Sequence, residues 1–281
     1  MIGTGADGSG TDTGGAGRGT DAARAADTRR DPGTGTAAHR VLRWWARPAE
    51  VRAAVLVLHG GEEHNLARPG RLNLPLLRMH GFLRSLERDT AGAGIALGTV
   101  RYRHRGWNGE RADAARDALA ALDEAAALLG PVPTVLIGHS MGGRAALRAG
   151  GHPSVTGLIA LAPWCPAGDP CDHLAGRDVL LLHGDRDTVT PPADTRAFAA
   201  RSRAAGARVC GYTVTGSGHA MLQRIPDWHR ATTRLATALL GLRPLPAEAA
   251  SALALPPASR EALSLPLPRQ PRTAPMLPSD G

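Results

Sequence analysis

Short apolar runs alternate with longer helical stretches through the middle of the chain, and this alternation restricts the fold more than any other feature. VRAAVLVLHGG at 51–61 and GIALGTVRY at 94–102 are typical of buried strands. Between them, apolar side chains from Leu72 to Leu86 recur at steps of three and four residues, which is the spacing of one helical face. The pattern predicts a strand, a helix and a second strand in that order.

The alternation continues through the middle of the chain. Further strands are predicted at 133–138, 157–163, 178–185 and 207–216, further helices after Asn108, after Ser140, over 192–204 and over 220–241, and an edge strand within 39–48. Strands joined by helices form right-handed crossovers, which produce a mostly parallel sheet with helices on both faces. We therefore expect an α/β fold of this architecture.

The link between the predicted strands at 157–163 and 178–185 leaves no room for a lid. It runs from Pro163 to Arg177, which is 15 residues. A crossover between parallel strands itself needs about a dozen residues. The other links are no better suited, so we expect no sizeable cap domain.

The two ends of the chain differ from the middle in composition. Residues 1–38 contain no large apolar side chain after Ile2, so they cannot bury enough surface to offset the entropy of ordering. Residues 243–281 are rich in proline, which removes backbone donors and interrupts helices. We expect a disordered segment at 1–38, one domain over 39–242 and a proline-rich disordered tail at 243–281.

The net charge of +8 comes from arginine alone, because the chain contains no lysine. The arginines are spread over the whole sequence, and RYRHRG at 101–106 is the only local cluster. A nucleic-acid interface normally shows a dense basic patch or stripe. A general preference for arginine explains the charge better, so we expect no nucleic-acid partner.

Neither a secretory signal nor an apolar run of membrane-spanning length is visible. The three cysteines lack the spacing of a zinc site, and their odd number does not suggest a disulfide framework. Glu62, Glu63 and His64 are more typical of a solvated loop than of a metal site. These features predict a cytoplasmic protein without a resident metal and without membrane contact.

The segment GHSMGG at 138–143 places a serine between glycines. Ser140 follows a predicted strand and precedes a predicted helix, which is the context of a nucleophile elbow. Gly138 and Gly142 would let the strand and the helix approach closely. The alternative is a serine that only caps the helix, and these few residues do not decide between the two.

Other chemically active groups follow other predicted strands. Asp187 lies in HGDRDTVTPP after the strand at 178–185, and His219 lies in GSGHAML after the strand at 207–216. LHGG at 58–61 ends the first strand and offers backbone N–H groups. Because ligands of parallel sheets bind at the carboxyl ends of the strands, we expect these groups to lie near Ser140.

With LHGG, GHSMGG, GDRDTVTP and GSGH in this order, residues from about 40 to 242 resemble the α/β-hydrolase family. The resemblance implies that Ser140 attacks a carbonyl carbon, that His219 moves the proton and that Asp187 orients His219. It also implies an oxyanion hole made by the N–H groups of Met141 and of Gly61, or of Glu62 beside it. The chemistry of such a triad needs no metal or organic cofactor.

Several neighbouring residues compete for these roles. In the G-D-x-D pattern, proteins similar to this one use the second aspartate, so Asp187 is preferred to Asp185. His59 and His139 are expected to be structural.

Two tryptophans follow predicted strands on the side of the candidate site. Trp107 and Trp164 are expected either to line the substrate pocket or to pack under loops. We assign them to the pocket as a hypothesis.

The function expected from these residues and from the resemblance is hydrolysis of a carboxylic ester or thioester by a serine hydrolase with a small-molecule acyl substrate. The same triad also serves amidases, peptidases, acyltransferases and cofactor-free perhydrolases. A silent binding protein on the same fold is the alternative from another class. No feature of the sequence predicts the oligomeric state.

Overall fold

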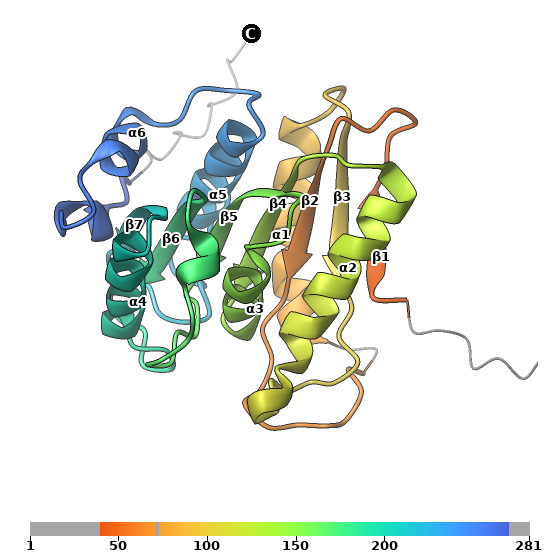
Figure 1. Cartoon of the computed structure of the whole chain (residues 1–281), viewed down its shortest axis with the longest axis horizontal. Helices are drawn as coiled ribbons and strands as arrows, with labels where there is room; N and C mark the ends of the chain where they lie inside the picture. The colour runs from red at the N-terminus through yellow and green to blue at the C-terminus, as the bar shows by residue number, and fades with distance from the viewer. Residues whose placement is uncertain (1–39, 71–72, 270–281) are drawn as a thin grey trace, which may run out of the picture. The chain divides into compact units, whose positions relative to one another are not determined.

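A mixed sheet forms the centre of the described part of the chain. The structure, a computed structural model, describes residues 40–70 and 73–269. Within these residues eight strands pair in the order β1-β3-β2-β4-β5-β6-β7-β8 (Figure 1). The strands are β1 Leu42–Ala46, β2 Ala53–Leu58, β3 Ile95–Val100, β4 Thr134–His139, β5 Val155–Leu161, β6 Asp178–Gly184, β7 Arg208–Val214 and β8 Leu265–Pro266.

The sheet is parallel apart from one edge. β1 runs antiparallel to β3, whereas all the other neighbouring strands are parallel. Every residue of β2, β3 and β4 is buried, as expected for strands that are covered on both faces. The predicted strands, including the edge strand within 39–48, are therefore confirmed.

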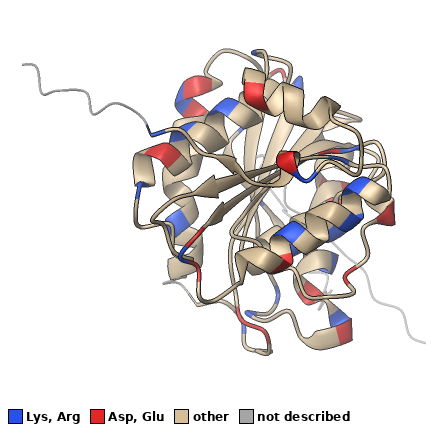
Figure 2. Ribbon diagram, turned by 90° about the vertical axis from the view of Figure 1, so that its left-hand side faces the viewer, with Lys and Arg blue, Asp and Glu red and all other residues tan. Residues whose placement is uncertain are grey.

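Helices cover both faces of the sheet. They are α1 Leu74–Asp89, α2 Asp113–Leu129, α3 Met141–Ala149, α4 Pro192–Ala204, α5 Ile225–Leu239 and α6 Ala247–Ala254. One core cluster contains side chains of α2, α3 and α4, and the other contains side chains of α1, α5 and α6. In Figure 2 most of the charged residues lie on helices and loops and few lie on the central strands.

Two helices begin later than the sequence pattern predicts. Asn108 has a left-handed backbone conformation and precedes a short 3-10 helix, Gly109–Arg111, so that α2 begins only at Asp113. α5 begins at Ile225 and not near 220, because Met221 and Arg224 also have positive φ angles that interrupt a helix.

The link between β5 and β6 contains only a short 3-10 helix, Asp172–Leu174. The expected fold class, an α/β sheet with no sizeable cap domain, is confirmed for the residues that the structure describes. None of the helices in residues 40–70 and 73–269 is long and apolar enough to span a membrane.

The prediction of a disordered tail at 243–281 is wrong for residues 243–269. This segment forms α6, a 3-10 helix at Glu261–Leu263 and β8, which pairs with β7. None of its prolines lies inside α6, since Pro246 precedes the helix and Pro256 follows it, so they do not interrupt it. Residues 1–38 and 270–281 of the predicted disordered ends lie outside the described residues.

Arg203 of α4 holds the C-terminal segment in place. Its side chain is buried and donates hydrogen bonds to the carbonyl groups of Val209, Ala252, Leu255 and Pro256 at 2.7–3.2 Å. This anchoring could not be predicted from the sequence. The partners of Arg203 are backbone carbonyl oxygens, which every residue has.

Candidate active site

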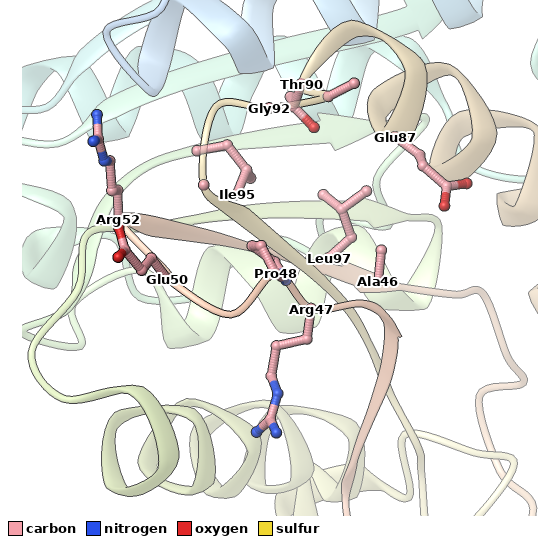
Figure 3. A pocket seen from close by; sticks show the side chains of 12 residues that line it. Ala46, Arg47, Pro48, Glu50, Arg52, Glu87, Thr90, Gly92, Ile95 and Leu97 are labelled. Carbon is pink, nitrogen blue, oxygen red and sulfur yellow. The ribbon is translucent and has the colours of Figure 1, made fainter.

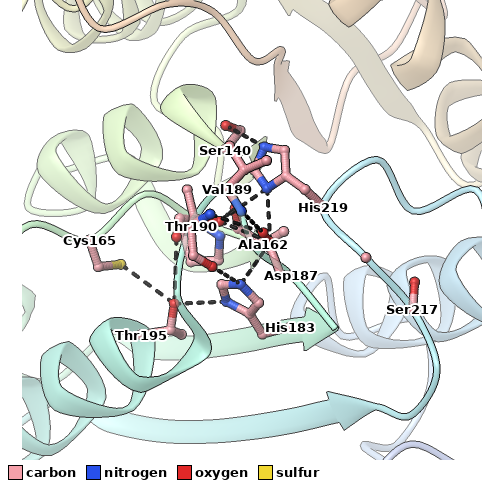
Figure 4. Close-up of polar contacts among 12 residues, drawn as sticks. Ser140, Ala162, Cys165, His183, Asp187, Val189, Thr190, Thr195, Ser217 and His219 are labelled. Atoms are coloured by element: carbon pink, nitrogen blue, oxygen red, sulfur yellow. Dashed lines mark hydrogen bonds and ion pairs between the residues drawn. The ribbon is translucent and has the colours of Figure 1, made fainter. Parts of the chain in front are cut away.

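Three polar side chains meet where β4, β6 and β7 end. Ser140 lies between β4 and α3, Asp187 follows β6 and His219 follows β7 (Figure 4). The sheet brings these residues together although 79 positions separate Ser140 from His219. The sequence-based expectation that they share the carboxyl edge of the sheet is confirmed.

The backbone at Ser140 forms a sharp turn. Its φ of 56° and ψ of −122° are unusual for a residue with a side chain. A Cβ atom on Gly138 would collide with the carbonyl group of Gly142, and one on Gly142 would collide with the carbonyl group of Leu58. Both glycines are therefore required for the close approach of strand and helix at this turn, as predicted.

Ser140, His219 and Asp187 form a continuous hydrogen-bonded chain. The distance from Ser140 Oγ to His219 Nε2 is 2.9 Å, and that from His219 Nδ1 to Asp187 Oδ2 is 2.8 Å. Because the carboxylate accepts from Nδ1, Nε2 is left to accept the serine proton. Ser140 makes no hydrogen bond that caps α3, which argues against the capping alternative.

Asp187 accepts further hydrogen bonds from its own loop. Its Oδ1 atom accepts from the N–H groups of Val189 and Thr190, each at 2.9 Å, and its Oδ2 atom accepts from Thr190 Oγ at 2.9 Å. Burial raises the pKa of Asp187, but the hydrogen bonds from His183, His219 and Thr190 outweigh burial and hold its pKa well below the usual range. Asp187 is therefore a firmly ionised acceptor for His219.

A second histidine, His183 at the end of β6, also contacts Asp187. His183 Nε2 lies 3.0 Å from Asp187 Oδ2 and 2.9 Å from the carbonyl oxygen of Thr190, so this nitrogen carries the hydrogen. Its Nδ1 atom lies 2.8 Å from Thr195 Oγ (Figure 4). Sequence reasoning did not single out His183 or Thr190. The available signal was the histidine in LHGDRD, two residues before Asp185.

Asp185, the competing aspartate, lies outside this chain of contacts. Its Oδ1 atom accepts a hydrogen bond from the N–H group of Gly216 at 2.7 Å. It thus ties the loop after β6 to the loop after β7. The geometry agrees with the preference for Asp187 as the partner of His219.

The candidate oxyanion groups lie beside the serine. A Cβ atom on Gly60 would come within 3.4 Å of Ser140 Cβ, and one on Gly61 would collide with the Met141 side chain. The N–H group of Glu62 donates to the carbonyl group of Arg105 at 2.9 Å, so it is occupied. The first N–H groups of a helix have no partner within it, and Met141 is the first residue of α3. Gly61 and Met141 remain the predicted pair.

His139 and His59 hold the backbone around the site. His139 Nε2 lies 3.0 Å from the carbonyl oxygen of His219, and His59 Nδ1 lies 2.6 Å from that of Gly60. Burial lowers the pKa of His139 to about 3 and that of His59 to about 4. Both rings are therefore neutral donors to carbonyl groups, which fits the structural roles expected for them.

The hypothesis that Trp107 lines the substrate pocket does not hold in this structure. Trp107 is 3% exposed and packs in the core that contains α2 and α3. Its ring and that of Trp164 lie 3.9 and 4.3 Å from the guanidinium carbon of Arg144, which pairs with Asp169. The cation therefore stacks on both rings. Trp164 is half-buried, and its backbone N–H group donates to the carbonyl group of Ser140, so of the two tryptophans it alone remains a pocket candidate.

Glu62, Glu63 and His64 are exposed, as a solvated loop requires. Glu62 pairs with Arg105 at 3.0 Å and accepts from the Asn65 amide at 2.9 Å. No group of three metal-ligating side chains occurs in the described residues.

Part of the chain matches a known sequence family. Residues 49–176 match the family described as Serine aminopeptidase, S33. This match spans less than half of the chain, and it includes Ser140 but ends before Asp187 and His219. A search of curated proteins found no match.

Solved structures share the fold at low sequence identity. A protein of unknown function from Agrobacterium tumefaciens, proposed to be an alpha/beta hydrolase, is 18% identical, with a TM-score of 0.55 over 73% of this chain and 93% of its own. Est1E from Butyrivibrio proteoclasticus, solved with ferulic acid bound, is 16% identical, with a TM-score of 0.52 over 71% and 96%. A monoacylglycerol lipase from Paleococcus ferrophilus is 17% identical, with a TM-score of 0.50 over 70% and 98%.

Proposed function

We propose that this chain, which has the α/β-hydrolase fold, is a serine hydrolase that cleaves a carboxylic ester or thioester through an acyl-enzyme on Ser140. The observation that carries the proposal is the hydrogen-bonded chain from Ser140 Oγ through His219 to the ionised Asp187. A serine that only caps a helix would need neither the strained turn nor the aligned imidazole.

The proposed reaction has two halves. In the first, Ser140 Oγ attacks the carbonyl carbon, His219 Nε2 takes the serine proton and then gives it to the leaving oxygen or sulfur. In the second, His219 takes a proton from water, the water oxygen attacks the acyl carbon and the proton returns to Ser140. Asp187 keeps the imidazole in its tautomer and stabilises the imidazolium in both halves.

The negative charge on the carbonyl oxygen would be stabilised by backbone donors. The N–H groups of Met141 and Gly61 are the proposed pair, with Met141 at the start of a helix whose dipole also favours an anion. One such donor typically contributes about 2.7–4 kcal/mol to the transition state.

Two points favour esters over amides. The names of the two structural neighbours, an enzyme solved with ferulic acid and a monoacylglycerol lipase, point toward esters. An ester also has a better leaving group than an amide, so its cleavage requires less stabilisation of the transition state by a site that is open to water. The family description favours a second candidate, an aminopeptidase.

Labelling with a fluorophosphonate probe tests the proposal without knowledge of the substrate. Wild-type protein should be labelled, and Ser140→Ala should lose both labelling and ester hydrolysis while it remains folded by circular dichroism. Ser251→Ala, which changes an exposed serine on α6, is the matched control and should behave as wild type.

The panel of substrates separates the candidates. p-Nitrophenyl esters, thioesters and aminoacyl p-nitroanilides are compared by kcat/KM, and we expect the esters or thioesters to be highest. Faster cleavage of the anilides would favour the aminopeptidase. Absence of labelling in wild-type protein would favour a silent binding protein.

A further inference from the structure

Two neighbouring cavities lie beside the loop that carries Gly60 and Gly61. The smaller has a volume of about 240 Å³ and is lined in part by both glycines. The larger has a volume of about 490 Å³, which is within the usual range for small-molecule sites. The two cavities share His59, Pro69, Gly70 and Asn73 as lining residues, so they adjoin each other.

The larger cavity is distinguished by its charge. Among the residues that the structure describes, its lining includes Arg43, Arg68, Arg101 and Arg103 and no aspartate or glutamate. We refer to it as the arginine cavity. Arg103 pairs with the buried Asp117, which anchors that side chain at the wall. The lining therefore favours a negatively charged group.

A cavity at the opposite end of the sheet shows that the high arginine content of the chain does not by itself explain the positive charge of the arginine cavity. It has a volume of about 460 Å³ and lies beside Arg52 and Ile95, at the starts of β2 and β3 (Figure 3). Its lining contains Arg47 and Arg52 but also Glu50 and Glu87. Of these two cavities of similar size, only the arginine cavity has no acidic side chain among its described lining residues.

The loop that carries Gly60 lies between the arginine cavity and the nucleophile. Gly60 packs against Ser140, since an added Cβ atom would lie 3.4 Å from Ser140 Cβ. The smaller cavity extends from Gly60 and Gly61 to Asn73, which also lines the arginine cavity. Ser140 itself lines neither cavity, so an ester bound there would have to extend one of its ends past Gly60 and Asn73 to reach the arginines.

We propose that the arginine cavity binds an anionic group of the substrate, so that Ser140 acts on esters that carry a carboxylate or a phosphate at one end. This inference rests on the proposed function. Guanidinium groups suit both anions, because their N–H donors match carboxylate and phosphate oxygens in pairs. The arginine side chains are exposed, so the attraction should weaken as salt screens it.

Matched substrates test the proposal. Mono-p-nitrophenyl adipate and p-nitrophenyl hexanoate have acyl chains of equal length, and only the first ends in a carboxylate. We expect kcat/KM to be at least tenfold higher for the adipate at 20 mM NaCl, and the ratio to fall at 500 mM NaCl. The mono-p-nitrophenyl ester of 5-phosphonopentanoic acid shows whether a phosphate-like group is preferred to a carboxylate.

A second pair places the charge on the leaving group. 4-Acetoxybenzoate and its methyl ester are compared in the same way, so that the two pairs together show which half of the ester enters the arginine cavity. A preference for the anion in either pair supports the proposal. A ratio of one or less in both pairs overturns it.

Arginine variants separate a specific site from a general positive field. Arg43→Gln combined with Arg68→Gln should lower the anionic-to-neutral ratio about tenfold, whereas Arg47→Gln combined with Arg52→Gln should leave it unchanged. Equal losses in both double variants would overturn the proposal, because a general field would then explain the preference.

Binding to the Ser140→Ala protein keeps this test independent of turnover. Calorimetry with monomethyl adipate and methyl hexanoate should show tighter binding of the anion, and that difference should disappear in the Arg43→Gln and Arg68→Gln background. Equal binding of both ligands contradicts the arginine cavity even if esters are hydrolysed. Selective binding without any hydrolysis contradicts the proposed function alone.

Discussion

Ser140 adopts a backbone conformation that typically costs about 1–3 kcal/mol for a residue with a side chain. Two hydrogen bonds fix it there. Its N–H group donates to the carbonyl group of Leu161 at 3.0 Å, and its carbonyl group accepts from the N–H group of Trp164 at 3.2 Å. Both partners belong to β5 or the link after it, so the neighbouring strand maintains the strain that exposes the hydroxyl group to His219.

At the same scale, the two aspartates after β6 should differ sharply in their effect on catalysis. Asp187→Asn removes the acceptor that fixes the tautomer of His219, so kcat should fall by a factor on the order of 10⁴, as in other triads. Steady-state kinetics on the best ester of the panel would measure the loss.

Asp185→Asn is the matched control, because within the described residues this carboxylate accepts a hydrogen bond from the loop N–H group of Gly216 and makes no contact with His219. It should lower kcat less than tenfold. If the two losses rank in the reverse order, Asp185 is the residue that orients the histidine.

The buried histidines should make the protein sensitive to mild acid. The pKa values of His59 and His139 are about 4 and about 3, whereas an unfolded histidine has a pKa of about 6.5. Below that value the unfolded chain binds protons that the folded protein does not, so stability falls as pH falls. As pH falls from about 5.5 to its folded pKa, each histidine should lower the free energy of unfolding by about 1.4 kcal/mol per pH unit.

Urea unfolding of wild-type protein and of His139→Gln between pH 7 and pH 4.5 would measure this dependence. The variant should be less stable at pH 7 but should show a shallower slope below pH 6. An unchanged slope would mean that His139 is protonated in the folded protein. His64→Gln, which alters an exposed histidine, is the control for the slope.

At the scale of elements, the segment after Leu242 extends the sheet beyond β7. Ala249, Ala252 and Leu253 of α6 are buried in the same core as α1 and α5. β8 pairs with Tyr212 and Thr213 of β7, and this pairing covers what would otherwise be an exposed edge. The proline-rich segment therefore stabilises the domain as far as residue 269.

Arg203→Gln should destabilise the protein more than any exposed arginine variant. The buried guanidinium satisfies several carbonyl groups at once, and each buried acceptor left without a donor costs about 1–3 kcal/mol. We expect a loss of at least about 3 kcal/mol in the free energy of unfolding, measured by urea denaturation. Arg260→Gln, at an exposed position of the same segment, should change it by less than about 0.5 kcal/mol.

Deletion of residues 243–281 should also destabilise the protein. It removes β8 and the apolar face of α6, so thermal unfolding should begin at least about 10 °C lower. If the truncated protein has the same melting temperature as the full-length protein, the segment does not belong to the folded domain.

At the scale of the whole molecule, the absence of a cap in the described residues sets the expected range of substrates. An added CH₂ group contributes its roughly 0.8 kcal/mol only where it is buried. Without a cap, a long acyl chain would remain largely in water. We expect kcat/KM for p-nitrophenyl esters to peak at short acyl chains and not to rise beyond about eight carbons.

The same open site should show no activation at an interface. When the concentration of a medium-chain ester is raised through its solubility limit, the hydrolysis rate should show no sudden increase. A steep rise toward long-chain esters, or a jump at the solubility limit, would indicate an acyl tunnel or a lid that the described residues do not contain.

The sequence by itself determined the order of strands and helices up to about residue 242, the turn at Ser140 and the placement of Asp187 and His219 after neighbouring strands; their proposed roles came from the family resemblance. The order, the turn and the placement follow from local rules, because hydrophobic periodicity, glycine spacing and the ends of parallel strands are all visible along the chain. The start of α5 was less predictable, because the positive φ angles of Met221 and Arg224 leave no mark in the hydrophobic pattern.

Beyond the groups at the carboxyl ends of the strands, only the tertiary structure decided which distant groups meet. The stacking of Trp107 on Arg144, the contact of His183 with Asp187 and the anchoring of the C-terminal segment by Arg203 all join residues by their positions in space. Such contacts depend on the packing of side chains and on carbonyl oxygens that every residue carries. A composition that suggests disorder, as in residues 243–269, is therefore overruled where a folded core offers both apolar surface and hydrogen-bond donors.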